Sequence, residues 1–171
     1  MSARPCEIHL AGVDDLAEMV ELWSRAQAAR AGANRRVETG VILALMRKRF
    51  AQRDAWFAIG RSSDRLVSIG HGVRAREDDG RGVPIPELMH LSLIAVEPGL
   101  WGRGFGRAMT EFGIARSFDL GYAAVQLWVH VSNERAKRLY RRLGFVASGR
   151  RKRDDGGELI EHCMLRREAT A

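Results

Sequence analysis

Closely spaced glycines are the sequence feature with the clearest chemical use: Gly102, Gly104 and Gly106. They follow the most hydrophobic strand candidate, residues 88–96, and they open an amphipathic segment. Glycine lets the backbone approach a ligand with no Cβ in the way. A helix start adds unpaired N–H groups and the positive end of the helix dipole. This combination binds phosphate or pyrophosphate, although a glycine-rich turn without a ligand is the alternative.

The spacing of these glycines separates the loop from two common phosphate-binding motifs. A Walker loop requires Gly-Lys-Ser/Thr, which this chain lacks. A dinucleotide fingerprint requires GxGxxG within a regular βαβ unit, whereas the pattern here is GxGxG, far into the chain. The sequence therefore favours a different kind of phosphate loop.

A second motif begins at Asn133, a residue type that caps helices. Apolar residues follow at helical spacing, namely Ala136, Leu139, Tyr140 and Leu143. Gly144 stands where such a helix should end. Tyr140 is suited either to proton transfer or to packing on this apolar face.

The remaining chain predicts the elements that must position both motifs. Strands are expected at residues 7–11, 55–61, 66–76, 88–96, 123–131, 145–150 and 159–165. Helices are expected after Asp15, over residues 40–52, from about Gly104 to Gly121, and after Asn133. Asp15 is expected to cap the first helix, with Glu18 completing a capping box. The order β-α-α-β-β-β-α-β-α-β-β predicts an α+β or mixed α/β fold, with a loop at 77–86.

The length and composition predict one soluble domain over residues 1–171. The chain has 171 residues, of which 46% are hydrophobic, and this size suits a single core. The longest apolar run, 41–46, is far below the ~20 residues that span a bilayer. No signal-peptide pattern begins the chain, and Cys6 and Cys163 lack zinc-site spacing. We expect a cytoplasmic protein without a metal, in a reducing compartment.

The net charge of +7 favours an anionic partner, such as nucleic acid, a membrane surface or a phosphorylated small molecule. Much of this charge falls in one run that contains Lys137, Arg138, Arg141, Arg142 and Arg150 to Arg153. A solvated helix face is the simpler interpretation of the run.

Taken together, the two motifs resemble the GCN5-related N-acetyltransferase (GNAT) family. The family's Arg/Gln-x-x-Gly-x-Gly/Ala pattern corresponds to residues 101–106, and its strand, Asn and Tyr-x-x-x-Gly-Phe pattern corresponds to residues 127–145. The close match covers residues 91–145. It implies a V-shaped mixed sheet of six to seven strands flanked by about four helices. Acetyl-CoA is then expected in the cleft between the fourth and fifth strands.

The resemblance implies an acetyl-CoA-dependent N-acetyltransferase in which a primary amine of a small molecule or peptide attacks the thioester directly. The cofactor-binding residues it implies are Ile94, Ala95, Val96, Trp101, Gly102, Arg103, Gly104, Phe105, Gly106, Arg107, Asn133 and Lys137. Loop amides would cradle the pyrophosphate, and the main chain of Ile94 and Val96 would pair with the pantetheine arm. Asn133 would contact that arm or cap its helix. Lys137 is one candidate for the 3′-phosphate, and Tyr140 would protonate the departing thiolate.

Two positions depart from the family pattern. Trp101 replaces the first Arg/Gln of the glycine motif, so a side-chain contact is lost and the indole would cover the cofactor or the loop. Trp128 stands where some protein N-terminal acetyltransferases of this family carry a catalytic base. The candidate bases are therefore Glu87 and His130, with His90 as a further one. An amine that arrives neutral would need none.

Two other functions remain open at this point. One is a non-catalytic CoA-binding regulator on the same fold, and the other is a basic nucleic-acid-binding module. We expect acetyl-CoA and an amine as partners, no membrane, and a homodimer as compatible with the family. Asp78 and Asp79 in the 77–86 loop would attract a cationic amine or simply remain solvated. Trp23 and Trp56 are expected in the core rather than in an acceptor pocket.

Overall fold

The computed structural model describes residues 6–31 and 38–168, which form two compact units. Unit 1 contains the described residues up to Val73 together with Leu93–Gly113. Unit 2 contains Arg74–Ser92 and the described residues from Ile114 onward.

Seven strands form a mixed sheet with the hydrogen-bonded order β1-β2-β3-β4-β5-β7-β6. The strands are β1 (Glu7–Leu10), β2 (Trp56–Ser62), β3 (Arg65–Arg76), β4 (Pro84–Val96), β5 (Ala124–His130), β6 (Val146–Arg153) and β7 (Leu159–Arg166). The helical segments are α1 (Leu16–Ala31), α2 (Thr39–Phe50), α3 (Glu77–Gly80), α4 (Phe105–Asp119) and α5 (Glu134–Arg142). Two 3₁₀ turns are also present, Val13–Asp15 and Pro98–Leu100. No helix in the described ranges is long and apolar enough to cross a membrane.

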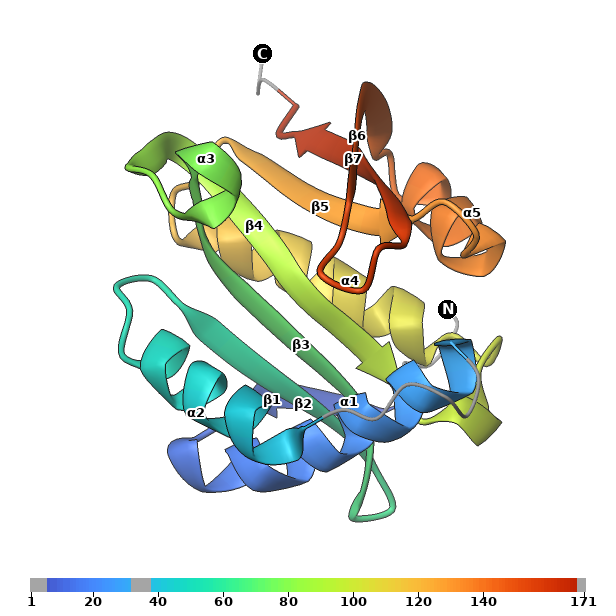
Figure 1. The fold of residues 1–171 in the computed structure, drawn as a ribbon. Helices are drawn as coiled ribbons and strands as arrows, with labels where there is room; N and C mark the ends of the chain where they lie inside the picture. The colour runs from blue at the N-terminus through green and yellow to red at the C-terminus, as the bar shows by residue number, and fades with distance from the viewer. Residues whose placement is uncertain (1–5, 32–37, 169–171) are drawn as a thin grey trace. The chain divides into compact units, whose positions relative to one another are not determined.

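In unit 1, α1 and α2 lie side by side and pack on β2 and β3 (Figure 1). Leu16, Met19 and Val20 of α1 are buried, as the helical spacing of the apolar residues predicts. Trp23 is partly buried against the same core. Trp56 of β2 is 3% exposed and meets Phe112 edge to face at 6.3 Å. The prediction that both tryptophans belong to the core is confirmed.

In unit 2, β5 is paired on both sides. It runs parallel to β4 over Leu88–His90 and antiparallel to β7 along its whole length. β6 pairs with β7 through a hairpin that closes between Arg153 and Leu159. α5 follows β5 directly and lies beside β7, where Lys137 of α5 meets Glu161 of β7 at 3.5 Å (Figure 1).

The mixed α/β class and the element order agree with the prediction, and three details differ. The loop predicted at 77–86 contains the helical turn α3, in which Asp78 and Asp79 have left-handed φ values of 49° and 55°. β4 begins earlier than predicted, at Pro84.

The cap predicted at Asp15 is also wrong. Asp15 lies in a 3₁₀ turn and its carboxylate accepts the Gly12 N–H at 2.8 Å. Glu18 pairs instead with Arg61, at 2.6 Å. Both cysteines are free and buried.

A glycine in β3 makes room for the Trp56 indole. Gly72 is paired with Trp56, and a Cβ at Gly72 would overlap the indole ring. We expect Gly72→Ala to lower the free energy of unfolding by about 2 kcal/mol through overpacking. Gly99→Ala, where a Cβ meets nothing within 4 Å, should leave it unchanged. Urea unfolding of both variants measures the difference, and equal stabilities would contradict the packing argument.

Candidate functional site

The glycine loop in unit 1 joins the end of β4 to the start of α4. After the 3₁₀ turn, Gly102 and Gly104 adopt left-handed φ values of 81° and 91°, which favour glycine over other residues. Both glycines are exposed, whereas Phe105 is buried and anchors the first turn of α4. The two left-handed residues therefore turn the chain from the strand into the helix while leaving the loop backbone accessible.

The start of α4 presents backbone donors to a ligand. The first hydrogen bond of the helix runs from the Ala108 N–H to the Gly104 carbonyl, at 3.0 Å. The N–H groups before Ala108 precede the helical ladder and lie at the positive end of its dipole. Arg103 is exposed beside them, and Arg107 pairs with Glu111 at 2.8 Å. This arrangement can hold an anion such as a pyrophosphate.

Trp101 fixes the loop to β4. Its indole N–H donates to the Val96 carbonyl at 2.9 Å, and the ring packs among Val96, Phe105 and their neighbours. Glu97 anchors the same strand end, since its N–H donates to the Val67 carbonyl and its carboxylate meets Arg25 at 2.9 Å. The indole therefore braces the loop at the position where the family pattern has a polar side chain.

In unit 2, Asn133 caps α5, as predicted. Its Oδ1 accepts the Ala136 N–H at 3.2 Å. Lys137 on this helix is already engaged in ion pairs within the protein. Its ammonium bonds to Glu134 at 2.8 Å and faces Glu161 at 3.5 Å. The hydrogen bond to Glu134 is the main reason that the pKa of Lys137 is raised. The exposed basic residues of the helix are Arg135, Arg138, Arg141 and Arg142.

Tyr140 lies on the apolar face of α5 and meets Phe145 edge to face at 5.8 Å. Burial raises the pKa of Tyr140 to about 12, with a smaller contribution from Cys163. The phenol is therefore protonated throughout the physiological range, and it is suited to donate a proton rather than to remove one.

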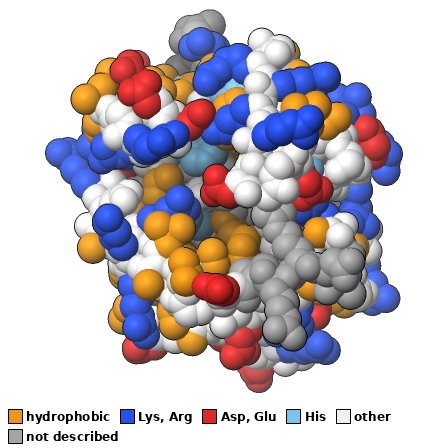
Figure 2. All heavy atoms as spheres, viewed as in Figure 1, with side chains coloured by type: hydrophobic (Ala, Val, Ile, Leu, Met, Phe, Trp, Pro, Cys, Tyr) orange, Lys and Arg blue, Asp and Glu red, His pale blue; other side chains and the backbone are white. Residues whose placement is uncertain are grey.

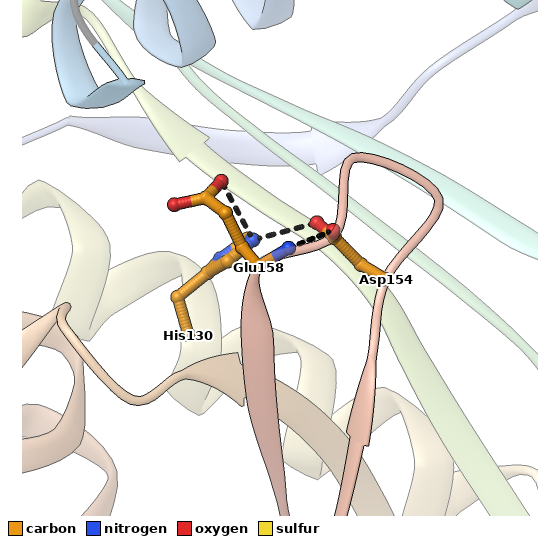
Figure 3. A group of neighbouring side chains, drawn as sticks. All are labelled: His130, Asp154 and Glu158. Atoms are coloured by element: carbon orange, nitrogen blue, oxygen red, sulfur yellow. Dashed lines mark hydrogen bonds and ion pairs between the residues drawn. The ribbon is translucent and has the colours of Figure 1, made fainter.

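His130, at the end of β5, faces two carboxylates from the β6–β7 hairpin (Figure 3). Its Nε2 lies 3.0 Å from Asp154 Oδ2 and 3.6 Å from Glu158 Oε2. Because carboxylate oxygens only accept, Nε2 carries a proton and the basic lone pair of the neutral ring is on Nδ1.

The hairpin backbone orients Asp154 toward the imidazole. Its Oδ1 accepts the N–H groups of Gly156 and Glu158, both at 2.9 Å, which leaves Oδ2 for His130. Burial raises the pKa of Asp154, but these hydrogen bonds and the one with His130 outweigh it and lower the pKa overall. Among the described residues, His130, Asp154 and Glu158 are also the group whose spacing would suit a metal ion, with ligand atoms within 4.8 Å of one another.

The other predicted residues of unit 2 are placed differently. Glu87 is exposed with a left-handed φ of 55°, and its carbonyl accepts the Ala123 N–H at 3.0 Å. Asp79 is paired with Lys152 at 2.7 Å, which lowers the pKa of Asp79. The ring of Trp128 is also covered, with Lys152 4.6 Å and Arg150 5.5 Å from its centroid. Basic side chains gather over β6 and β7 in Figure 2.

Comparisons with known proteins bear on both parts of the chain. Residues 46–145 match the model of the acetyltransferase (GNAT) family. A mycothiol acetyltransferase of Thermobifida fusca is 31% identical over 145 residues, which cover 78% of this chain and 41% of that protein. The chain thus spans less than half the length of this relative, and 22% of the mycothiol acetyltransferase of Propionibacterium freudenreichii.

Two solved structures share the fold. The putative acetyltransferase yncA from Salmonella typhimurium, solved with its cofactor acetyl-CoA, has a TM-score of 0.75 at 19% identity, covering 98% of this chain and 96% of that one. The ribosomal-protein-S18-alanine N-acetyltransferase from Escherichia coli has a TM-score of 0.72 at 19% identity, covering 96% of each chain.

The lowered pKa of Asp154 predicts how the hairpin responds to acid. A carboxyl with a lowered folded-state pKa stabilises the fold fully above its ordinary value of 3.8, and loses that contribution as pH falls through the lower folded value. We expect Asp154→Asn to be less stable than the wild type at pH 6, and the gap to shrink below pH 3.8. Urea unfolding across this pH range measures the gap. A gap that stays constant would contradict the assignment.

Proposed function

Because the chain belongs to the GNAT acetyltransferase family, we propose that it transfers the acetyl group of acetyl-CoA to a primary amine of a small molecule or peptide. The observation that carries the proposal is the loop at the start of α4, in which Gly102 and Gly104 have left-handed conformations and stand within the family motif. A loop of this kind offers main-chain donors to a pyrophosphate, a group that CoA and acetyl-CoA share.

In this proposal the amides of 102–106 hold the pyrophosphate, except that of Arg103, which donates to the Leu100 carbonyl at 3.4 Å. The main chain of Ile94 and Val96 pairs with the pantetheine arm. Trp101 contributes by fixing the loop rather than by contacting phosphate, since its indole N–H is committed to Val96. Arg138 and Arg141 join Lys137 as candidates for the 3′-phosphate, because both are exposed.

The transfer requires an amine that has lost a proton and a leaving thiolate that gains one. His130 is the proposed base and takes the proton on Nδ1, while Asp154 and Glu158 hold the ring through Nε2. The same two carboxylates attract an ammonium group. Tyr140 is the proposed acid, and its raised pKa keeps the donor protonated at every working pH.

Three further expectations belong to the proposal: a cytoplasmic location, a single functional domain and a possible homodimer. The two buried free cysteines support the reducing compartment.

A thiol-release assay with acetyl-CoA against a panel of amines and peptides tests the proposed activity. Amine-dependent release of CoA supports a transferase. Acetyl-CoA binding without release would instead identify a CoA-binding regulator, and salt-sensitive nucleic-acid binding without acetyl-CoA affinity would identify the basic module.

Tyr140→Phe removes the proposed acid and retains the ring that packs on Phe145. We expect kcat to fall about 100-fold while the Kd for acetyl-CoA changes less than about twofold, because the hydroxyl acts on the leaving group. Steady-state kinetics and calorimetric titration measure the two effects. Unchanged turnover would remove Tyr140 from the acid role.

His130→Gln and Glu87→Gln form a matched pair that distinguishes the two candidate bases. We expect kcat/KM to fall about 100-fold in His130→Gln and to stay within about twofold of wild type in Glu87→Gln. The reason is that His130 is held by two carboxylates, whereas Glu87 is exposed on a left-handed residue. The reverse pattern would assign the base to Glu87.

A further inference from the structure

We propose that Ser148, His162 and Gln126 form a nucleophile, base and orienting group that accept an acyl group from an activated ester or thioester. The three residues lie on neighbouring strands of unit 2, β6, β7 and β5 respectively. They include neither the proposed acid nor the proposed base of amine acetylation, so this inference goes beyond the proposed function.

Two short hydrogen bonds connect the three side chains. His162 Nδ1 lies 2.7 Å from Ser148 Oγ, and His162 Nε2 lies 2.8 Å from Gln126 Oε1. His162 is 1% exposed and Gln126 is 8% exposed, whereas Ser148 is an exposed residue. A buried imidazole therefore has one nitrogen directed at a hydroxyl on the surface.

The Gln126 contact determines which nitrogen of His162 is basic. A carboxamide oxygen only accepts hydrogen bonds, so Nε2 must carry the ring proton. The lone pair is then on Nδ1, and the Ser148 hydroxyl donates to it. This is the arrangement in which a histidine removes a proton from a nucleophilic serine while a third group fixes the tautomer.

The backbone around Ser148 forms a bulge, which changes the direction of the Ser148 side chain relative to a regular strand. The pairing of β6 with β7 shifts register between Ala147 and Arg151, and Gly149 inside this bulge has a left-handed φ of 83°. A bulge re-aims a side chain relative to a regular strand. The Arg150 N–H, also in the bulge, points at Ser148 Oγ from 3.3 Å and would favour a developing alkoxide.

The surroundings keep His162 neutral and in place. The Trp128 ring lies 5.1 Å from the imidazole, centroid to centroid. Burial lowers the pKa of His162, and the charges of Arg150 and Lys152 lower it further. The ring is therefore neutral at neutral pH, and its Nδ1 lone pair is free of a proton and can accept one from Ser148.

The acylation step balances without a further reactant. Ser148 Oγ attacks the acyl carbonyl carbon as His162 Nδ1 takes the hydroxyl proton, so an O–C bond forms. The C–S bond of a thioester, or the C–O bond of an aryl ester, then breaks, and the leaving group receives that proton. The products are an acyl ester on Ser148 and a free thiol or phenol.

The test uses p-nitrophenyl acetate as the probe, followed by intact mass and peptide mapping of the full chain. We expect one acetyl ester on Ser148 in the wild type, none in Ser148→Ala, and a rate about 100-fold lower in His162→Gln. Gln126→Glu replaces the orienting amide with a carboxylate of the same shape, and should raise the acylation rate about tenfold by strengthening the base. This variant keeps the test decisive if His162→Gln does not fold.

Acetylation of other residues only, or equal rates in wild type and Gln126→Glu, would overturn the proposal. The aryl ester needs no CoA site, so the result is independent of the proposed transferase activity. Tyr140→Phe should retain Ser148 acetylation while it loses amine transfer, and Ser148→Ala should show the opposite.

Discussion

The backbone conformation of the loop before α4 is the constraint on which the account depends. Gly102 and Gly104 both have φ values in the left-handed region, where a Cβ is disfavoured. Their geometry lets the chain leave β4 and enter α4 within a few residues, with the first amides of the helix still unpaired. Phe105 holds the helix start in the core, and Trp101 ties the loop to the Val96 carbonyl. Both anchors keep the row of donors rigid, since a loose loop would have to become ordered when an anion binds, and that ordering would cost affinity.

The strand alternation of unit 2 divides its chemistry between two faces. Trp128 and His162 are register partners and share one face, and His130 lies two residues beyond Trp128 on that face. Glu161 lies on the other face, where it meets Lys137 of α5. The face with Trp128 therefore presents the histidines and the hairpin carboxylates, while α5 carries Tyr140 over the opposite one.

Much of this arrangement could be predicted from the sequence, because it depends on local patterns. The spacing of apolar residues predicts α1 and α5, and the residue type of Asn133 predicts the N-cap of α5. The glycine pattern predicts the loop. The partners of His130 could not be predicted in this way. Asp154 is 24 residues away in sequence, in a segment that has the composition of an ordinary polar turn. Only the pairing of β5 with β7 brings this hairpin to His130. The orientation of the Ser148 side chain could not be predicted either. It depends on the bulge between Ala147 and Arg151, which no local sequence pattern indicates. The left-handed conformations of Asp78 and Asp79 cannot be predicted from residue type, because aspartate adopts that conformation only in particular turns.

The most direct measurement is a calorimetric titration of acetyl-CoA into wild type, Gly104→Val and Gly99→Ala. A β-branched residue at the left-handed Gly104 strains the loop, whereas Gly99 has ordinary φ and open space around it. The account predicts wild-type affinity for Gly99→Ala and binding at least about tenfold weaker for Gly104→Val, with both variants folded. Normal affinity in Gly104→Val would show that the loop does not hold the cofactor.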